Sequence, residues 1–310
     1  MSSHAAAVRR TGVLGALGTL WRFSRPHTLI GTFVSATGLY LIAVHELPGA
    51  GLDHLLWVIV AGAGVNLAIV GVNQITDVEI DRINKPHLPL AAGELTRDGA
   101  WRIVAVAAAL PLVLGLTQGP LETGAVVAAL AVGAAYSVPP VRLKRFPIAA
   151  ALCISGVRSA VVNLGMYGHF SLAFGGGALT IAPSVWALTA FVLPFSFAIA
   201  VLKDVPDMEG DRRYRIATLT VRLGPRRAAR LGLAALALAY AGMAIAGPLL
   251  VGDADPVVMS AGHTAALVLL LTWARRADPA DPAAFTAFYM RVWGLFFLEY
   301  ALVPAAVLAG

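Results

Sequence analysis

The residues best suited to chemistry lie in two short acidic stretches, NQITDVEID at 73–81 and KDVPDMEGD at 203–211. Each stretch has three polar side chains at steps of three or four, the spacing that stacks side chains on one face of a helix. They are Asn73, Asp77 and Asp81 in the first stretch, and Asp204, Asp207 and Asp211 in the second. Like charges at this spacing repel, so each cluster needs a positive partner.

The chemistry that these side chains suit is the binding of Mg²⁺. This ion usually takes one or two protein carboxylates and completes its shell with water and phosphate oxygens. Two facing clusters therefore predict a site in which metal ions, each held by one cluster, bridge the protein to a diphosphate. Nearby cations are expected to donate charge-assisted hydrogen bonds to the phosphates: Arg82, Lys85, Arg142, Lys144 and Lys203. The groups expected to be catalytic are Asp77, Asp81, Asp207, Asp211 and Lys144.

The elements that position these clusters are predicted to be membrane-spanning helices. The 310-residue chain is 58% hydrophobic and only 13% charged, which is too apolar for a soluble domain. Nine apolar runs have about the twenty residues that a helix needs to cross the hydrocarbon. They lie near 28–46, 54–75, 100–118, 121–138, 146–168, 183–202, 229–247, 257–274 and 284–309. We therefore expect an all-α integral membrane protein with nine transmembrane helices.

The distribution of basic residues predicts the orientation, because cytoplasmic loops collect Lys and Arg. The segments 46–53, 169–182 and 248–256 contain neither residue. The other segments carry the basic residues, which are Arg9, Arg10, Arg22 and Arg25; Arg82, Lys85, Arg97 and Arg102; Arg142, Lys144 and Arg145; and Lys203, Arg212, Arg213, Arg215, Arg222, Arg226 and Arg227. Arg275, Arg276 and Arg291 bracket the last connection. The N-terminus and both acidic stretches are thus expected in the cytoplasm, and the C-terminus on the far side.

The net charge of +6 is mainly a consequence of this topology. Its basic residues are spread over five loops with little aromatic interleaving, so we expect no nucleic-acid partner. Cys153 is the single cysteine, which excludes an intramolecular disulfide. Each acidic stretch ends an apolar run and precedes a basic loop. This repeated layout predicts a pseudo-symmetric bundle with one site where the halves, about 1–145 and 146–310, meet.

Longer motifs identify a family resemblance. The segments NQITDVEIDRINKPHLPLAAGE and KDVPDMEGDRRYRIATLTVRLG resemble the two signatures of the UbiA superfamily of intramembrane prenyltransferases, most closely its homogentisate branch. The resemblance extends to RPHT at 25–28, YSVPPVRLKR at 136–145, VRSAVVNLG at 157–165 and FYMRVWGLFFLEY at 288–300. It implies a single domain over 1–310, with the helices around a central cavity capped by cytoplasmic loops. The implied reaction moves a prenyl group from an allylic diphosphate to a ring carbon of an aromatic acid.

Arg158 is the cation whose position most needs an explanation. It lies about twelve residues into the fifth predicted span, where an unpaired charge is costly. An internal ion pair or a snorkelling side chain would account for it. Alternatively, Arg158 and Asn163 bind the carboxylate of the acceptor, homogentisate-like or 4-hydroxybenzoate-like, and the resemblance favours this reading. His169, near the far end of the same span, is expected to be solvated.

Aromatic side chains are expected to wall the prenyl tail and to stabilise a carbocation through their ring faces. The proposed wall residues are Phe195, Phe197, Tyr289, Trp293 and Phe297. A terpene cyclase would use the same metal chemistry without an acceptor, and Arg158 argues against it. Cation transport would not explain the motifs beside the clusters. Richness in Ala, Arg, Gly and Pro favours a bacterial plasma membrane, and quinone, tocopherol or meroterpenoid biosynthesis follows from the resemblance.

Overall fold

The computed structural model describes residues 12–214 and 216–310, and within these residues it contains helices and no strands. Nine of the described helices are long and apolar enough to cross a membrane, which confirms the prediction. They are α2 (Pro26–Glu46), α3 (Leu52–Thr76), α5 (Arg97–Gln118), α6 (Pro120–Ser137), the continuous segment Pro147–Phe174, α9 (Pro183–Leu202), α12 (Pro225–Leu250), α13 (Pro256–Ala274) and α14 (Pro282–Ala309). Most of them begin with proline, which suits the first turn because that position needs no N–H donor.

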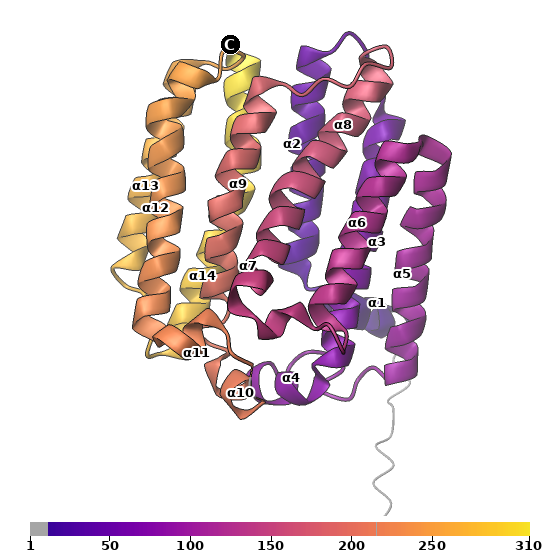
Figure 1. Ribbon diagram of the computed structural model, residues 1–310, viewed down its shortest axis with the longest axis vertical. Helices are drawn as coiled ribbons and strands as arrows, with labels where there is room; N and C mark the ends of the chain where they lie inside the picture. Colours follow the sequence, from indigo (N-terminus) through magenta and orange to yellow (C-terminus); the bar gives the residue numbers. More distant parts are fainter. Residues whose placement is uncertain (1–11, 215) are drawn as a thin grey trace, which may run out of the picture.

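The spans stand side by side, and the short helices gather at one end of the bundle (Figure 1). These short helices are α4 (Val78–Asn84), α10 (Met208–Arg213) and α11 (Leu219–Leu223), and the C-terminus lies at the opposite end. Helix α14 packs against α2, and α7 (Pro147–Gly156) packs against α9. Residues from the two ends of the chain therefore share one bundle.

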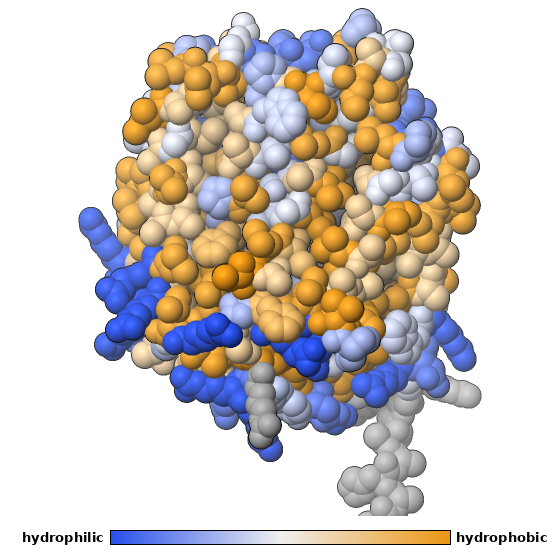
Figure 2. Space-filling view, in the orientation of Figure 1, coloured by the Kyte–Doolittle hydropathy of each residue, from blue (hydrophilic) through white to orange (hydrophobic). Residues whose placement is uncertain are grey.

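The surface is divided into an apolar band and a hydrophilic end (Figure 2). The hydrophilic side chains are densest at the end where α4, α10 and α11 lie, and fewer lie at the opposite end. This is the pattern expected of a protein whose middle is covered by lipid. Arg9, Arg10 and Arg215, which contribute to the predicted orientation, lie outside the described residues.

The fifth span is irregular. A π-helical turn, Val157–Val162, separates α7 from α8 (Asn163–Phe174). Such turns are uncommon and are frequently found at functional sites, because they displace side chains from the regular helical positions. Arg158 lies in this turn.

Helices α2 and α14 approach closely at Gly38. A Cβ atom at that position would lie 2.5 Å from the backbone oxygen of Tyr300. Tyr300 and Phe296 are buried on the same face of α14. The absence of a side chain at Gly38 therefore sets the distance between two helices that border the central cavity.

Candidate active site

The first acidic stretch lies on a bend between two helices. Helix α3 ends at Thr76, Asp77 has φ −114° and ψ 12°, and α4 begins at Val78. The stretch is therefore not one uninterrupted helix. The hydrogen bonds nevertheless continue, because Asp77 N–H donates to Asn73 O at 3.0 Å and Asp81 N–H donates to Asp77 O at 2.8 Å. The three side chains keep a common side despite the bend.

The second stretch is built in the same way and is tied to the first. Helix α9 ends at Leu202, and α10 begins after Asp207, with Asp211 N–H donating to Asp207 O at 3.2 Å. Asn84 Oδ1 accepts a hydrogen bond of 2.9 Å from Gly210 N–H, and Lys85 forms an ion pair with Asp207. The two clusters thus meet although they are far apart in the sequence.

Both clusters line one polar pocket of about 80 Å³. Its lining includes all six predicted metal ligands: Asn73, Asp77, Asp81, Asp204, Asp207 and Asp211. Four of the five aspartates are at most 9% exposed. Four cations line the same pocket: Arg25, Lys85, Lys144 and Lys203. The five carboxylates are therefore nearly balanced by basic groups, which reduces the cost of burying them.

Cations hold the carboxylates in specific pairs. Lys144 binds both oxygens of Asp77, and Arg142 Nη2 donates to Asp77 Oδ1 at 3.0 Å. Lys203 Nζ lies 2.8 Å from Asp204 Oδ1. Asn73 Nδ2 also donates to Asp77 Oδ2, at 3.0 Å. The positive partners of Asp77 therefore come from the connection between α6 and α7, and that of Asp204 is the preceding residue of its own stretch.

Two aspartates in the pocket lack such a direct partner, and their acidity is weakened. Burial raises the pKa of Asp81 to about 6, and the charges of Asp77 and Asp207 add to this effect while Lys85 opposes it. Burial likewise raises the pKa of Asp211 to about 7, with Asp204 and Asp207 contributing. A bound cation would favour the ionised form of both groups.

The pocket fits Mg²⁺ by the chemistry of its donors. Carboxylate and amide oxygens are hard ligands, and two clusters face the same space. Among the described residues, no three His, Cys, Asp or Glu side chains converge closely enough to hold an ion by themselves. An ion held here would complete its shell with water and phosphate oxygens, as Mg²⁺ usually does.

One predicted phosphate-binding residue lies apart from the polar pocket, and two residues that were not predicted to bind there line it. Arg82 is 54% exposed and pairs with Glu79 at 2.8 Å, outside the pocket lining. Arg25 and Tyr136 line the polar pocket and also a second, larger cavity. Arg25 and Arg142 both have positive φ, at 52° and 39°. Non-glycine residues in this region tend to mark functional sites, a signal that only the folded backbone carries.

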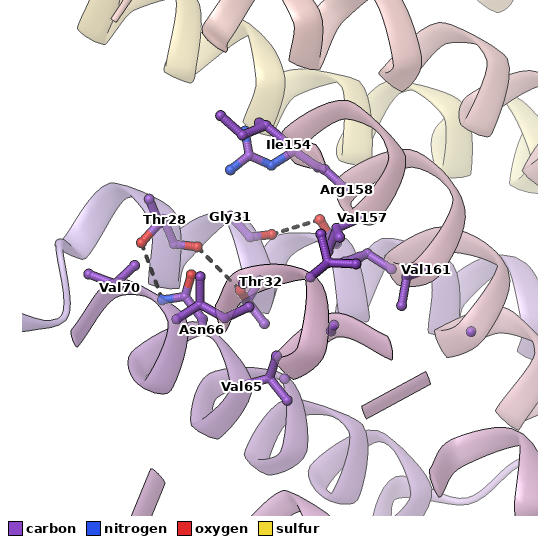
Figure 3. A pocket seen from close by; sticks show the side chains of 18 of the residues that line it. Thr28, Gly31, Thr32, Val65, Asn66, Val70, Ile154, Val157, Arg158 and Val161 are labelled. Atoms are coloured by element: carbon purple, nitrogen blue, oxygen red, sulfur yellow. Dashed lines mark hydrogen bonds between the residues drawn. The ribbon is translucent and has the colours of Figure 1, made fainter. Parts of the chain in front are cut away.

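The larger cavity, of about 320 Å³, adjoins the polar pocket. The two share the lining residues Arg25, Asn73, Tyr136, Ile154 and Lys203. The walls are largely apolar, with Val65, Val70 and Val161 among them. Figure 3 shows Arg158 and Ile154 on one side of this space, and Thr28 with its hydrogen-bond partner Asn66 on another. A polar head and an apolar chain could thus occupy adjoining spaces.

Arg158 enters the cavity without an anionic partner. Its guanidinium carbon lies 4.7 Å from the ring centre of Trp293 and 5.4 Å from that of Phe296. Its Nη1 atom is buried and has no hydrogen-bond partner. No carboxylate of the described residues forms a salt bridge with it, so the internal ion pair considered above is absent there. Asn163 instead accepts a 2.6 Å hydrogen bond from Tyr300 Oη and does not line the cavity.

The predicted aromatic wall is divided in the same way. Tyr289 and Trp293 line the cavity, as does Phe296, which the sequence analysis does not select. Phe195, Phe197 and Phe297 are absent from the lining. Phe195 is fully buried against Phe191 and Tyr240, between helices. Helical phase explains the exchange of Phe297 for Phe296, because neighbours on α14 point to different sides.

Comparison with known proteins agrees with this architecture. The model of the UbiA prenyltransferase family matches residues 28–295. The chain is 42% identical over 307 residues to homogentisate phytyltransferase of Synechocystis sp., covering 95% of this chain and 97% of that protein. It is 38% identical over 302 residues to homogentisate phytyltransferase 1 of Arabidopsis thaliana, covering 93% and 75%.

A solved structure supports the fold. A UbiA homologue from Archaeoglobus fulgidus, bound to GPP and Mg²⁺, aligns with a TM-score of 0.60 at 19% identity, covering 93% of this chain and 99% of that one. The fold and the site thus define a membrane-embedded prenyltransferase. The chain belongs to the UbiA prenyltransferase family, and it is an enzyme that transfers prenyl groups to an aromatic acceptor.

Proposed function

We propose that this enzyme joins the prenyl group of an allylic diphosphate to a ring carbon of a homogentisate-like acid, with Mg²⁺, and releases pyrophosphate. The observation that carries the proposal is the pairing of two adjoining spaces, one lined by carboxylates and lysines and one apolar with Arg158 in its wall. The first suits a diphosphate, the second suits a prenyl chain, and Arg158 suits the carboxylate of the acceptor.

The diphosphate would be held by the two acidic clusters and the basic loops. Bound Mg²⁺ would neutralise the charge that develops on the leaving pyrophosphate. The proposed ligands are Asn73, Asp77 and Asp81 for one ion, and Asp204, Asp207 and Asp211 for another. Lys85, Lys144, Lys203 and Arg142 would exchange their present carboxylate partners for phosphate oxygens. Arg82 would join them only by leaving Glu79.

The acceptor would be positioned by Arg158 and the ring faces around it. As the C1–O bond of the diphosphate breaks, its electron pair leaves with pyrophosphate, and a ring carbon of the acceptor then bonds to C1 and loses its proton. Arg158 would hold the carboxylate and orient the ring. Tyr289 and Trp293 would face the positive charge, and the apolar walls would exclude water.

We also infer the setting in which the reaction occurs. The chain would work as one domain over 1–310, built from the halves 1–145 and 146–310. Its N-terminus and active site would face the cytoplasm, as the basic loops indicate. A bacterial plasma membrane fits the composition, and the relatives named for homogentisate favour a product related to tocopherols or quinones.

The test is mass spectrometry of products made by purified enzyme with Mg²⁺. Geranyl, farnesyl, geranylgeranyl and phytyl diphosphates would each be offered with homogentisate or with 4-hydroxybenzoate. A prenylated homogentisate is expected, and its mass reports whether CO₂ is lost. If 4-hydroxybenzoate is prenylated and homogentisate is not, the acceptor is 4-hydroxybenzoate-like and the homogentisate-like assignment is wrong. A terpene formed without any acceptor would overturn the assignment of Arg158.

A further inference from the structure

A polar cluster lines the cavity at the end opposite to the carboxylate pocket. Trp57 on α3, Glu122 on α6 and His169 on α8 line the cavity there, and we call these three residues the end wall. Asn73 lines the other end from the same helix as Trp57. Their separation of sixteen positions (73 minus 57) corresponds to about 24 Å of helix. The cavity thus extends through most of the ~30 Å hydrocarbon layer.

The end wall is fixed by stacking and hydrogen bonds. His169 is 3% exposed, so the expectation that it is solvated is wrong. Its Nδ1 lies 2.8 Å from Glu122 Oε1, and its Nε2 lies 3.0 Å from Nδ1 of His54. The Trp57 ring stacks on His169 at 4.7 Å with an angle of 22°. Because each ring is held by its neighbours, the wall cannot easily yield to a ligand.

Polar atoms in this wall lack partners. Glu122 Oε2 is buried and accepts no hydrogen bond, and Trp57 Nε1 is buried and donates none. The nearby cavity lining is apolar, with Ala125, Val126 and Ala129 on the same helix as Glu122. An alkyl chain gains free energy along that lining, but it can pass the end wall only by breaking the stacking and the hydrogen bond that hold Trp57, His169 and Glu122 together.

We propose that the end wall determines prenyl-chain specificity, by stopping the chain at a fixed distance from the diphosphate. The proposal rests on the proposed function, which places the diphosphate at the carboxylate end and the chain in the cavity. A chain that ends before the wall contacts only apolar groups. A chain one isoprene unit longer must displace Trp57 or bury its terminal methyl groups against Glu122.

The experiment measures kcat/KM for geranyl, farnesyl, geranylgeranyl and geranylfarnesyl diphosphates, with one acceptor. The readout is a ratio of two kcat/KM values. The numerator is the value for the diphosphate one isoprene unit longer than the preferred one, and the denominator is the value for the preferred diphosphate. Trp57→Ala removes the ring, and Glu122→Leu/His169→Leu replaces both polar partners at similar volume. Each variant is expected to raise the ratio by about tenfold, the effect typical of adding or removing a few carbons in an apolar pocket.

A second buried His–Glu pair provides a matched control. His263 Nε2 lies 3.1 Å from Glu299 Oε1, both residues are fully buried, and Glu299 Oε2 also lacks a partner, but neither lines the cavity. His263→Leu/Glu299→Leu should leave the ratio unchanged.

Three results would overturn the end-wall proposal: an unchanged ratio in both end-wall variants, an equal rise in the control, or equal use of all four chains by the wild type. If the double variant does not fold, the ratio measured for Trp57→Ala still tests the end-wall proposal. A wild-type enzyme that uses none of the diphosphates would instead refute the proposed function.

Discussion

Asp77 is the residue on which the electrostatics of the polar pocket converge. It binds Lys144, Arg142 and Asn73 and has 9% of its surface exposed. A buried carboxylate that is so extensively paired is stable only while its partners remain. The same network supplies oxygen ligands and phosphate-binding cations within one small space, as a metal-bridged diphosphate requires.

Replacing Asp77 or Asp207 by Asn should lower kcat by about 100-fold or more, because charge stabilisation at the leaving group is lost. Asn preserves the shape of the side chain and removes its charge. Glu79→Gln is the control, since Glu79 is exposed and pairs with Arg82 outside the pocket. Turnover and the detergent elution profile would be measured together. Near-normal turnover in both Asn variants would remove the case for the metal site.

Arg158→Ala should weaken use of an acceptor that carries a carboxylate. A hydrogen bond to a charged group contributes about 1.5–3 kcal/mol, which corresponds to roughly 10- to 150-fold in kcat/KM. Arg158→Lys should recover only part of this, because Lys lacks the planar fork that stacks on Trp293.

The control for this prediction is a change of substrate. With an acceptor ring that has no carboxylate, the wild type and Arg158→Ala should differ much less. An equal loss on both acceptors would show that Arg158 supports the fold of the cavity and does not bind the carboxylate.

At the scale of elements, the position of α2 against α14 depends on Gly38. In Gly38→Ala, the new methyl group would lie 2.5 Å from Tyr300 O, so one helix must move. Overpacking of this kind costs about 1–3 kcal/mol. The variant should therefore lose its folded state several degrees below the wild type in a thermal scan by size-exclusion chromatography. Gly18→Ala is the control, because no atom lies within 4 Å of the new methyl group, and it should not lower the unfolding temperature.

At the scale of the whole molecule, the nine candidate spans of the described residues predict that the two ends of this part of the chain lie on opposite sides of the membrane. A reporter enzyme that is active only outside the cytoplasm should be active when fused after Gly310, and inactive when fused within the loop between α9 and α12. The physical reason is that Lys and Arg are retained in the cytoplasm during insertion. Activity of the loop fusion would reverse the predicted orientation.

Much of the architecture was predictable because its signals are local. Membrane spans need about twenty consecutive apolar residues, and all nine predicted runs coincide with described helices. The paired acidic stretches were equally visible, since charged clusters at the ends of apolar runs have few explanations. The motifs around them also sufficed to identify the family, which the comparisons confirm.

Contacts between distant segments could not be predicted in this way. Arg25 reaches the polar pocket from the start of α2, and Phe296 replaces Phe297 in the cavity wall, because helix rotation depends on packing against neighbours. Asn163 is directed to Tyr300, 137 residues away in the sequence.

The sequence by itself determined that this protein is a helical membrane enzyme with a carboxylate-rich site. Only the tertiary structure decided which side chains share a cavity. His169 illustrates the reason: whether a histidine is solvated or buried beside Glu122 depends on which helices meet, and that choice is made by packing over the whole bundle.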